Sequence, residues 1–563
     1  MNDTKRVFEA PGGGAWELET AHFTRPMTTF AQEAVAGGFP EGFAEGMARY
    51  GMLLSHFEPR FVHGFMYQRA VAFGAPPDAK GPPPKLIFQA LTRLHPAMRR
   101  RIRAGHEAME KKVWREDLRR WDDHVKPASI RRHLELSAID VRAMSDEELC
   151  AHLEVCIAHV RAMIRQHHEF TATCILPVGD LLAHVQEWTG KAPGEILQVL
   201  RGSSQISLGV AREELEALAA AIRGDAEAKA ILDHGGAAAL DGLKAHPGAV
   251  GEKARAYLEL TGLRCLGYDI GSKSAIEMPD VLVRAIQAAV RGEASGSKSD
   301  LEARIAKLRE AVPAEHRARF DELLGEARFI NRLRDERGHY SDGWASGIAR
   351  RGVLEAGRRL VEKGRLTSAE LAVDATCREL CDLLRGKPGP STEEIQERVS
   401  WRTTKTASDP DIPAWLGAPP SPPPPAEWLP EKARRGQRAV SAFIGTLFGE
   451  PAVERTATSV KGLPVSPGVY EGTARLVADE SDFGLVQQGD VLVTRATSPY
   501  FNVVLPLLGA IVTDRGGQLC HAAIVSREYG IPGVVGTREA TQLIPDGARV
   551  RVDGDAGTVV VLG

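Results

Sequence analysis

A proline-rich stretch constrains the fold of this 563-residue chain more than any other feature of its sequence. Residues 410–430 read PDIPAWLGAPPSPPPPAEWLP. Proline lacks a backbone N–H and fixes φ, so such a run cannot form a helix interior or a central strand. It favours the extended polyproline II conformation instead. The sequence therefore predicts a linker over residues 406–454 between separately folded parts. It would be a mobile arm, an ordinary tether or a strap packed on a neighbour.

The part before the linker has the composition and periodicity of α-helices. Residues 76–405 are rich in Ala, Leu, Arg and Glu, which are strong helix formers. Leu215, Leu218 and Ile222 recur at i, i+3 and i+7, on one face of a helix. We expect a mostly α-helical domain that binds the substrate, with residues 1–75 as its N-terminal segment.

The part after the linker, residues 455–563, changes character. Short valine-rich runs alternate with turn residues and predict strands at 491–494, 509–513, 549–552 and 558–561. One helix fits between them, from His521 to Tyr529, closed by Gly530. The sequence therefore predicts a multidomain α plus α/β protein that ends in a compact β/α domain.

Charge and composition exclude several classes of protein. The net charge is −3 and aromatic residues make up 6%, which argues against binding of nucleic acid. The first 21 residues have no apolar core, so we expect no signal peptide. No run of about 18 apolar residues occurs, so we expect no membrane span. Seven widely spaced cysteines are typical of reduced thiols in the cytoplasm.

The stretch 513–536, TDRGGQLCHAAIVSREYGIPGVVG, is the strongest candidate for chemistry. A strand ends at Thr513, a loop with Gly516 and Gly517 follows, and His521 then opens a helix. The free N–H groups and the dipole at a helix N-terminus suit a phosphate. A neutral imidazole there is a competent nucleophile toward phosphorus. The pattern indicates a phosphorylatable histidine, and the alternative from this pattern alone is a helix cap or core histidine.

The whole stretch resembles the phosphohistidine signature of the mobile domain of phosphoenolpyruvate-utilising enzymes. That domain occurs in phosphoenolpyruvate synthase, pyruvate phosphate dikinase and rifampicin phosphotransferase. The resemblance implies that His521 carries a phosphoryl group in a swivelling domain, held by Thr513 and the amides of Gly516 and Gly517. Cys520 departs from the pattern, which has Ser or Thr before the histidine, and a thiol is a poorer hydrogen-bond partner than a hydroxyl. The residues that match the signature are Gly516, Gly517, His521, Ala522, Ala523, Arg527, Glu528, Gly530, Ile531, Pro532 and Gly536.

The helical part is similar to the substrate domain of rifampicin phosphotransferase and of phenol-phosphorylating systems. The similar patches are residues 22–28, 41–57, 60–67, 268–270 with 277–279, and 332–340 followed by 352–360. Full-length members of the family also carry an ATP-grasp domain, yet this sequence has no Walker A string or other glycine-rich nucleotide loop. The resemblance therefore implies a split system such as phenylphosphate synthase or the aryl dikinases. In such a system a separate ATP-grasp subunit holds ATP and Mg²⁺, and this chain is inactive without it.

The implied reaction converts ATP, a phenol and water into an aryl phosphate, AMP and phosphate. A phenol has a pKa of about 10, so a base should accept its proton. Arg332, Asp335, Glu336 and His339 fall on one helix face, where His339 or Asp335 would be the base. Arg332 and Arg337 would hold the phosphoryl oxygens. The alternative is a solvated, charged face. Further candidates for substrate contact are Arg25, Asp269, Glu336 and Tyr340.

Other functions stay open at this point. The same chain organisation would serve a different hydroxyl acceptor, such as an antibiotic. It would also serve a regulatory phosphocarrier that signals through His521 and makes no small-molecule product. We expect no metal site on this chain and no membrane partner.

Overall fold

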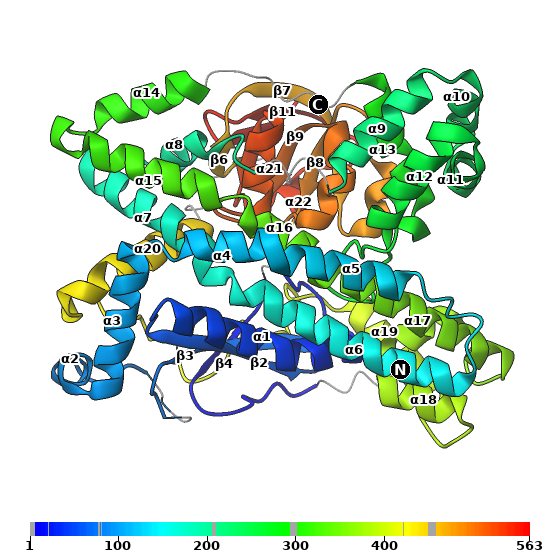
Figure 1. Cartoon of the computed structure of the whole chain (residues 1–563), viewed down its shortest axis with the longest axis horizontal. Coiled ribbons are helices and arrows are strands. Elements are labelled where there is room, and N and C mark those ends of the chain that lie inside the picture. The colour runs from blue at the N-terminus through cyan, green and yellow to red at the C-terminus, as the bar shows by residue number, and fades with distance from the viewer. Residues whose placement is uncertain are drawn as a thin grey trace. The chain divides into compact units, whose positions relative to one another are not determined.

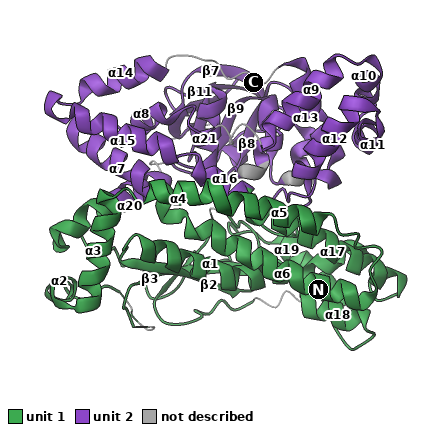
Figure 2. Ribbon diagram, viewed as in Figure 1, with its two compact units in different colours: residues 1–174, 268–272, 340–438 green, residues 175–267, 273–339, 439–563 purple. Residues whose placement is uncertain are grey.

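The structure is a computed structural model that describes residues 6–20, 22–76, 79, 81–204, 210–292, 301–419, 421–448, 456 and 458–562. The chain folds into two compact units, coloured separately in Figure 2. Unit 1 comprises residues 1–174, 268–272 and 340–438, and unit 2 comprises residues 175–267, 273–339 and 439–563. The helical segment 76–405 thus contributes to both units. Among the described residues, no helix is long and apolar enough to span a bilayer.

Unit 1 contains a small antiparallel sheet (Figure 1). Most of the helices of this unit come from two stretches of the chain. The strands are β1 (Ala15–Leu18), β2 (Leu54–Val62), β3 (Phe65–Ala72) and β4 (Trp415–Gly417), in the order β2-β3-β1-β4. The early helices are α1 (Thr29–Arg49), α2 (Lys85–Leu94), α3 (Pro96–Glu110), α4 (Trp114–Arg120), α5 (Lys126–Ser137) and α6 (Asp146–Glu169). The later helices are α17 (Asp342–Glu362), α18 (Cys377–Leu384) and α19 (Thr392–Thr404).

The stretch expected to be a linker has more structure than a tether. Strand β4 pairs with β1, where Leu416 lies opposite Trp16, and both side chains belong to a buried apolar cluster. Helix α20 (Glu431–Phe448) follows the prolines and continues from unit 1 into unit 2. The proline run 422–425 itself adopts neither helix nor strand, as proline chemistry requires. Residues 420 and 449–454 of this stretch lie outside the described part of the chain.

Unit 2 joins a set of helices to the C-terminal β/α domain. Helix α7 (Thr171–Thr189) leads into it, and α21 (His521–Tyr529) and α22 (Ala540–Leu543) belong to the C-terminal domain. The other helices are α8 (Pro193–Leu197), α9 (Arg212–Arg223), α10 (Ala226–Asp233), α11 (Gly236–Ala245), α12 (Gly248–Thr261), α13 (Pro279–Arg291), α14 (Leu301–Ala311), α15 (Arg317–Ile330) and α16 (Leu333–His339).

The C-terminal domain is built on an eight-stranded sheet in the order β5-β12-β11-β7-β8-β9-β10-β6. Its four central strands, β7 to β10, run parallel. Strand β8 is buried along its whole length, as expected for a parallel strand covered on both faces. The strands are β5 (Ser459–Lys461), β6 (Leu463–Ser466), β7 (Val469–Val477), β8 (Asp490–Thr494), β9 (Leu508–Thr513), β10 (Gly533–Val535), β11 (Arg549–Asp553) and β12 (Thr558–Val561).

The predicted elements of this domain are confirmed. All four expected strands are present as β8, β9, β11 and β12, and α21 covers the expected residues His521–Tyr529. Gly530 ends that helix with φ of +69°, the left-handed conformation that favours glycine. The protein is therefore a multidomain α plus α/β chain, as its sequence predicts.

One face of the C-terminal sheet shares a hydrophobic core with the neighbouring helices of unit 2. Ala523 and Val525 of α21 belong to the same buried cluster as Leu218 of α9 and Leu282 of α13. Because side chains alternate along a strand, Leu492 of β8 faces this cluster while its neighbours on the strand face another. The β/α domain is thus packed on helices in this structure.

Candidate functional site

His521 lies where a buried strand gives way to a helix. Strand β9 ends at Thr513, and α21 begins at His521 with Cys520 as its N-cap residue. The Cys520 side chain makes no capping hydrogen bond. Gly516 has φ of +112°, and a Cβ atom there would lie 2.7 Å from Cys520 Sγ. Glycine at this position therefore lets the loop turn and pass close to the residue before the histidine.

Two side chains set the chemical state of His521. Its Nδ1 atom lies 3.0 Å from Thr497 Oγ1. The imidazole is partly buried, and burial together with the positive charge of Arg334 lowers the pKa of His521 from 6.5 to about 3. The imidazole is therefore neutral at neutral pH, which is the nucleophilic form. Its second nitrogen, Nε2, is left for chemistry.

The loop that follows β8 contacts two histidines. Thr497 of this loop holds His521, and Asn502, in the 3-10 turn Pro499–Val503, lies with Nδ2 3.3 Å from His339 Nε2. His339 is the last residue of α16 and is buried. One short segment of the C-terminal domain thus positions both the expected phosphoryl carrier and one of the two expected bases.

The acidic side chains of α16 are held by other protein groups. Asp335 accepts a hydrogen bond of 2.9 Å from the Ser204 hydroxyl, and Glu336 forms an ion pair of 2.7 Å with Arg332. Asp335, Glu336 and His339 are all buried, so the alternative of a solvated charged face does not describe these three residues. Arg337 lies on the same helix and is partly buried.

Two of the expected phosphoryl-binding groups have other partners. The Thr513 hydroxyl is fully buried and donates to the carbonyl of Arg515, 2.8 Å away. The amide of Gly517 donates to the carbonyl of Leu447, 3.0 Å away, near the end of α20. The sequence could not reveal the second bond, because Leu447 lies some seventy positions away from Gly517 along the chain. That Thr513 and Gly517 hold phosphoryl oxygens stays a prediction, and it requires these bonds to be exchanged when the phosphoryl group is present.

The candidates for substrate contact in unit 1 have local structural roles. Arg25 donates to the carbonyl of Thr403. Asp269 accepts from the backbone N–H of Thr28 at 2.7 Å and from its hydroxyl at 2.6 Å. This carboxylate therefore fixes the residue that caps the start of α1. Tyr340 accepts from His133 Nε2 at 3.2 Å through its carbonyl. Arg25, Asp269 and Tyr340 belong to unit 1, whereas His521 and His339 belong to unit 2.

The structure adds four residues that were not among the predicted site residues. Thr497 is the first residue of a Thr-Ser-Pro string, and Arg334 lies inside the arginine-rich stretch, so both had some signal in the sequence. Asn502 had none. Glu528, near the end of α21, is buried and accepts a hydrogen bond of 2.9 Å from the amide of Gly202. Burial raises the pKa of Glu528 to about 7.

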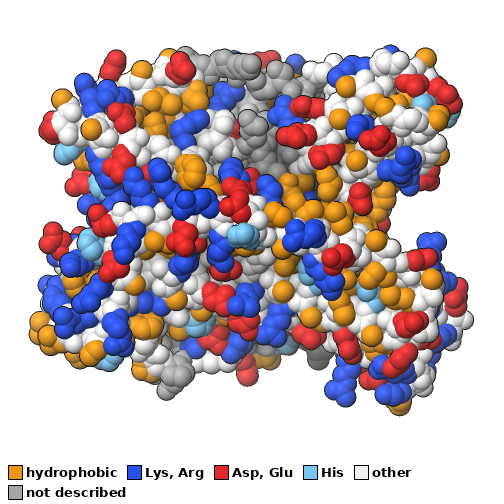
Figure 3. Space-filling model, in the orientation of Figure 1, with side chains coloured by type: hydrophobic (Ala, Val, Ile, Leu, Met, Phe, Trp, Pro, Cys, Tyr) orange, Lys and Arg blue, Asp and Glu red, His pale blue; other side chains and the backbone are white. Residues whose placement is uncertain are grey.

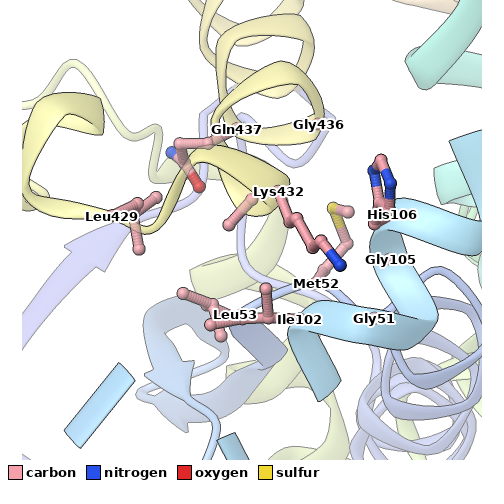
Figure 4. A pocket seen from close by; sticks show the side chains of 11 residues that line it. Gly51, Met52, Leu53, Ile102, Gly105, His106, Leu429, Lys432, Gly436 and Gln437 are labelled. Carbon is pink, nitrogen blue, oxygen red and sulfur yellow. The ribbon is translucent and has the colours of Figure 1, made fainter. Parts of the chain in front are cut away.

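Unit 1 contains a small cavity between the loop that precedes β2, helix α3 and the start of α20 (Figure 4). Its volume is about 20 Å³, room for a single water molecule, so it does not hold an aromatic substrate. Among the described residues no group of three His, Cys, Asp or Glu side chains is arranged to hold a metal ion. The residues that line the cavity are Gly51, Met52, Leu53, Ile102, Gly105, His106, Leu429, Lys432, Ala433, Gly436 and Gln437.

Two segments of the chain match known protein families. Residues 486–557, which include the loop after β8 and all of α21, match the mobile domain of phosphoenolpyruvate-utilising enzymes. Residues 166–336, which run from the end of α6 into α16, match the fourth domain of rifampicin phosphotransferase. Both families suggested by the sequence motifs are thus found, and the boundary of the second falls within the arginine-rich helix.

The chain is also similar to longer proteins that include a rifampicin phosphotransferase and a phosphoenolpyruvate synthase. The chain is 30% identical over 346 residues to a rifampicin phosphotransferase of Streptomyces sviceus, an overlap that covers 57% of this chain and 36% of that protein. It is 48% identical over 100 residues to a probable phosphoenolpyruvate synthase of Archaeoglobus fulgidus, covering 18% of this chain and 13% of that one. An uncharacterised phosphotransferase of Bacillus subtilis is 29% identical over 230 residues, 26% of its length. The chain therefore spans about a third or less of these relatives.

Proposed function

We propose that this chain, which contains a phosphoenolpyruvate-utilising enzyme mobile domain and a rifampicin phosphotransferase fourth domain, is the histidine-carrying, substrate-binding subunit of an ATP-dependent phosphotransferase. It takes a phosphoryl group on His521 and passes it to the hydroxyl of a phenolic compound. The overall reaction is that of a dikinase: ATP, the acceptor and water give a phosphorylated acceptor, AMP and phosphate.

The observation that carries this proposal is the loop after β8. Thr497 contacts His521, and Asn502, five residues later, contacts His339. A carrier histidine and a candidate base are therefore organised by one segment. Both candidate bases already have partners, since Asn502 Nδ2 lies against His339 Nε2 and the Asp335 carboxylate accepts the Ser204 hydroxyl. We assign the role of base to His339, because it contacts the same loop as His521.

The first step charges His521. In the tautomer that donates Nδ1–H to the Thr497 hydroxyl oxygen, the lone pair lies on Nε2. This lone pair attacks phosphorus, the N–P bond forms, and the bond from phosphorus to the donor oxygen breaks with its electron pair. The low pKa of His521, about 3, keeps the lone pair available at neutral pH. The positive charge of Arg334, which lowers the pKa of His521, would also stabilise the negative charge of the transferred group.

The second step discharges His521. The acceptor oxygen attacks phosphorus, the N–P bond breaks, and its electron pair returns to Nε2. The acceptor's proton must leave as its oxygen attacks, because a neutral phenol has a pKa of about 10. His339 takes this proton on Nε2 when its hydrogen bond from Asn502 Nδ2 opens. Arg334 and Arg332 stabilise the charge on the phosphoryl oxygens.

The nucleotide chemistry belongs to a partner in this proposal. The relatives are much longer than their overlap with this chain, which covers 36% of the rifampicin phosphotransferase. We propose that ATP and Mg²⁺ bind a separate ATP-grasp subunit, which phosphorylates His521. The proposed location of both subunits is the cytoplasm.

The test is phosphosite mapping at neutral to basic pH, where phosphohistidine survives. The chain and its His521→Ala variant are incubated with magnesium ATP, with and without a candidate ATP-grasp subunit. We expect acid-labile phosphate on His521 only when that subunit is present, followed by its loss and the appearance of aryl phosphate when a phenol is added. Equal phosphorylation of the His521→Ala variant would refute the carrier role.

A second acceptor class is favoured by a specific observation, the match of residues 166–336 to the rifampicin phosphotransferase fourth domain. In this alternative the acceptor is a hydroxyl of rifampicin or a similar antibiotic. The charged chain is mixed with phenol in one sample and with rifampicin in another, and the release of phosphate from His521 is followed. Faster discharge by rifampicin would replace the phenol assignment and leave the carrier role intact.

A further inference from the structure

Helix α2 of unit 1 turns its apolar side outward. Leu86 is 79% exposed and Leu94 is 73% exposed, while Ile87 and Leu91 are also exposed. These four side chains lie on one face, since Leu86 and Leu94 are eight positions apart and Ile87 and Leu91 are four apart. The opposite face carries Phe88, whose ring packs on Trp428 at 6.2 Å.

An arrangement of this kind is unusual for a surface helix. Amphipathic helices normally bury their apolar stripe against the core and leave the polar side in water. Single exposed leucines are ordinary, but a contiguous group of large apolar side chains marks a site of interaction. Figure 3 shows hydrophobic side chains beside Lys and Arg at the corner where Figure 1 draws α2 and α3.

The same segment is strongly basic. Residues 85–103 contain six Lys and Arg residues and no Asp or Glu. Arg101 points inward, where it donates to the carbonyl of Met52 at 2.8 Å. Arg93 donates to the carbonyl of Trp428, which leaves its charge unbalanced. The exposed side chains Lys85, Arg99, Arg100 and Arg103 form no ion pair within the part of the chain that the structure describes.

The charge and the apolar side chains of this surface indicate what kind of partner binds it. A symmetric contact between two copies of the chain would bring like charges together, which opposes association. A membrane surface would attract the cations, but α2 has only ten residues and its exposed face lacks the aromatic side chains that anchor interfacial helices. An acidic protein surface with an apolar groove satisfies both the leucines and the arginines.

We propose that this surface, the α2 docking face, binds the separate ATP-dependent protein that phosphorylates His521. The face consists of Lys85, Leu86, Ile87, Leu91, Leu94, Arg99, Arg100 and Arg103. This inference rests on the proposed function. The face lies outside both family matches, residues 166–336 and 486–557. The partner is expected to present Asp and Glu around an apolar groove.

The experiment compares two variants with a control in the full chain. One carries Leu86→Asp and Leu94→Asp, and the other carries Arg99→Glu, Arg100→Glu and Arg103→Glu. The control is Arg378→Glu on α18, because the Arg378 side chain is 92% exposed and lies far from the face in sequence. The rate of His521 phosphorylation is measured while the concentration of the ATP-grasp subunit is varied.

We expect at least about a tenfold rise in the half-saturating concentration of that subunit for both variants, and none for the control. The arginine variant should also lose most of the salt dependence of the wild-type chain. Chemical phosphorylation with phosphoramidate, which needs no partner, should charge His521 equally in all four proteins and so exclude misfolding.

Three other results would overturn the inference. The first is an unchanged half-saturating concentration in both variants. The second is that the wild-type chain binds vesicles of phosphatidylglycerol and phosphatidylcholine and the variants do not, while the subunit still charges the variants normally. The face would then be a lipid site. The third is that the wild-type chain forms a dimer and the variants are monomers. If no ATP-grasp subunit charges even the wild-type chain, the proposed function itself fails, which is a distinct outcome.

Discussion

The start of α21 and the end of α16 place a histidine in opposite helical surroundings. His521 occupies the first position of its helix, where free N–H groups and the positive end of the dipole meet an incoming phosphate. His339 occupies the last position of its helix, beside the negative end of the helix dipole. The same side chain is therefore suited to carry a phosphoryl group in one place and to accept a proton in the other.

Their neighbours strengthen the difference. His521 has an arginine nearby, and together with burial this holds the pKa of its imidazole at about 3. His339 has the neutral amide of Asn502 against its Nε2 atom. The comparison teaches that the identity of a residue does not assign its role, because burial, neighbouring charges and hydrogen-bond partners differ between the two sites.

The largest expected effect follows from removing His339. In His339→Ala, phosphorylation of His521 should be unchanged, while transfer to the acceptor should fall by about 10²- to 10⁴-fold, the usual contribution of general base catalysis. Single-turnover measurements on the charged chain separate the two steps. The control is His234→Ala, which removes an exposed histidine of the same unit. Unchanged transfer in His339→Ala would remove it from the mechanism.

Removing Arg334 should affect the other histidine. In Arg334→Ala the pKa of His521 should rise toward 6.5, although burial still holds it below that value. Wild-type charging should stay constant as pH falls from 8 to 5, because the imidazole remains neutral. The variant should lose activity at a higher pH than the wild type and be slower by about 10²-fold, since a cation near the phosphoryl group is missing.

The check is a pH–rate profile of His521 phosphorylation, with Arg334→Lys as the conservative control that keeps the charge. A variant profile that coincides in shape with the wild type would contradict the electrostatic role of Arg334.

A smaller effect is expected for the hydroxyl that orients His521. Thr497→Val keeps the shape of the side chain but loses the hydrogen bond to Nδ1, so charging should slow by about fivefold to tenfold, the equivalent of about 1 kcal/mol. Thr497→Ser should retain the wild-type rate. Nitrogen-edited NMR of the charged chain identifies the phosphorylated atom, which should be Nε2 in the wild type, and phosphate found on Nδ1 would refute this orientation.

Glu528→Gln, near the end of α21, should have the smallest effect on catalysis and a measurable effect on stability. Glu528 has a pKa raised by burial from 4.5 to about 7, so the folded protein binds a proton that the unfolded chain releases between these values. Stability from this group is therefore lost as pH rises from about 4.5 to 7. Glu528→Gln cannot ionise, so it should be more stable than wild type at pH 8, by up to roughly 3 kcal/mol, and similar at pH 4.5.

Denaturant unfolding at the two pH values provides the measurement. Glu471→Gln, at an exposed position on β7 of the same domain, should show no such difference. Equal stability of Glu528→Gln and wild type at pH 8 would mean that the carboxylate is compensated by its neighbours.

The sequence by itself determined the local structure around His521 and the resemblance to the mobile domain. The loop glycines, the start of α21 and the glycine that ends it all lie within ten residues of His521. The signature that resembles the mobile domain lies in the same stretch of the sequence. The alternating strands of the C-terminal domain were predictable for the same reason, because periodicity is a property of consecutive residues. The proline run was likewise correctly excluded from regular structure.

Only the tertiary structure decided what each side chain contacts. Asn502 and His339 are 163 positions apart, and no pattern in either segment announces their hydrogen bond. The amide of Gly517 was available in the sequence and is taken by the end of α20 in the fold. The apolar face of α2 was indistinguishable from a core face until its exposure was known. Local propensity fixes the conformation of a segment, but hydrogen bonds, charge neighbours and burial depend on segments far away along the chain, so they emerge only when the chain is packed.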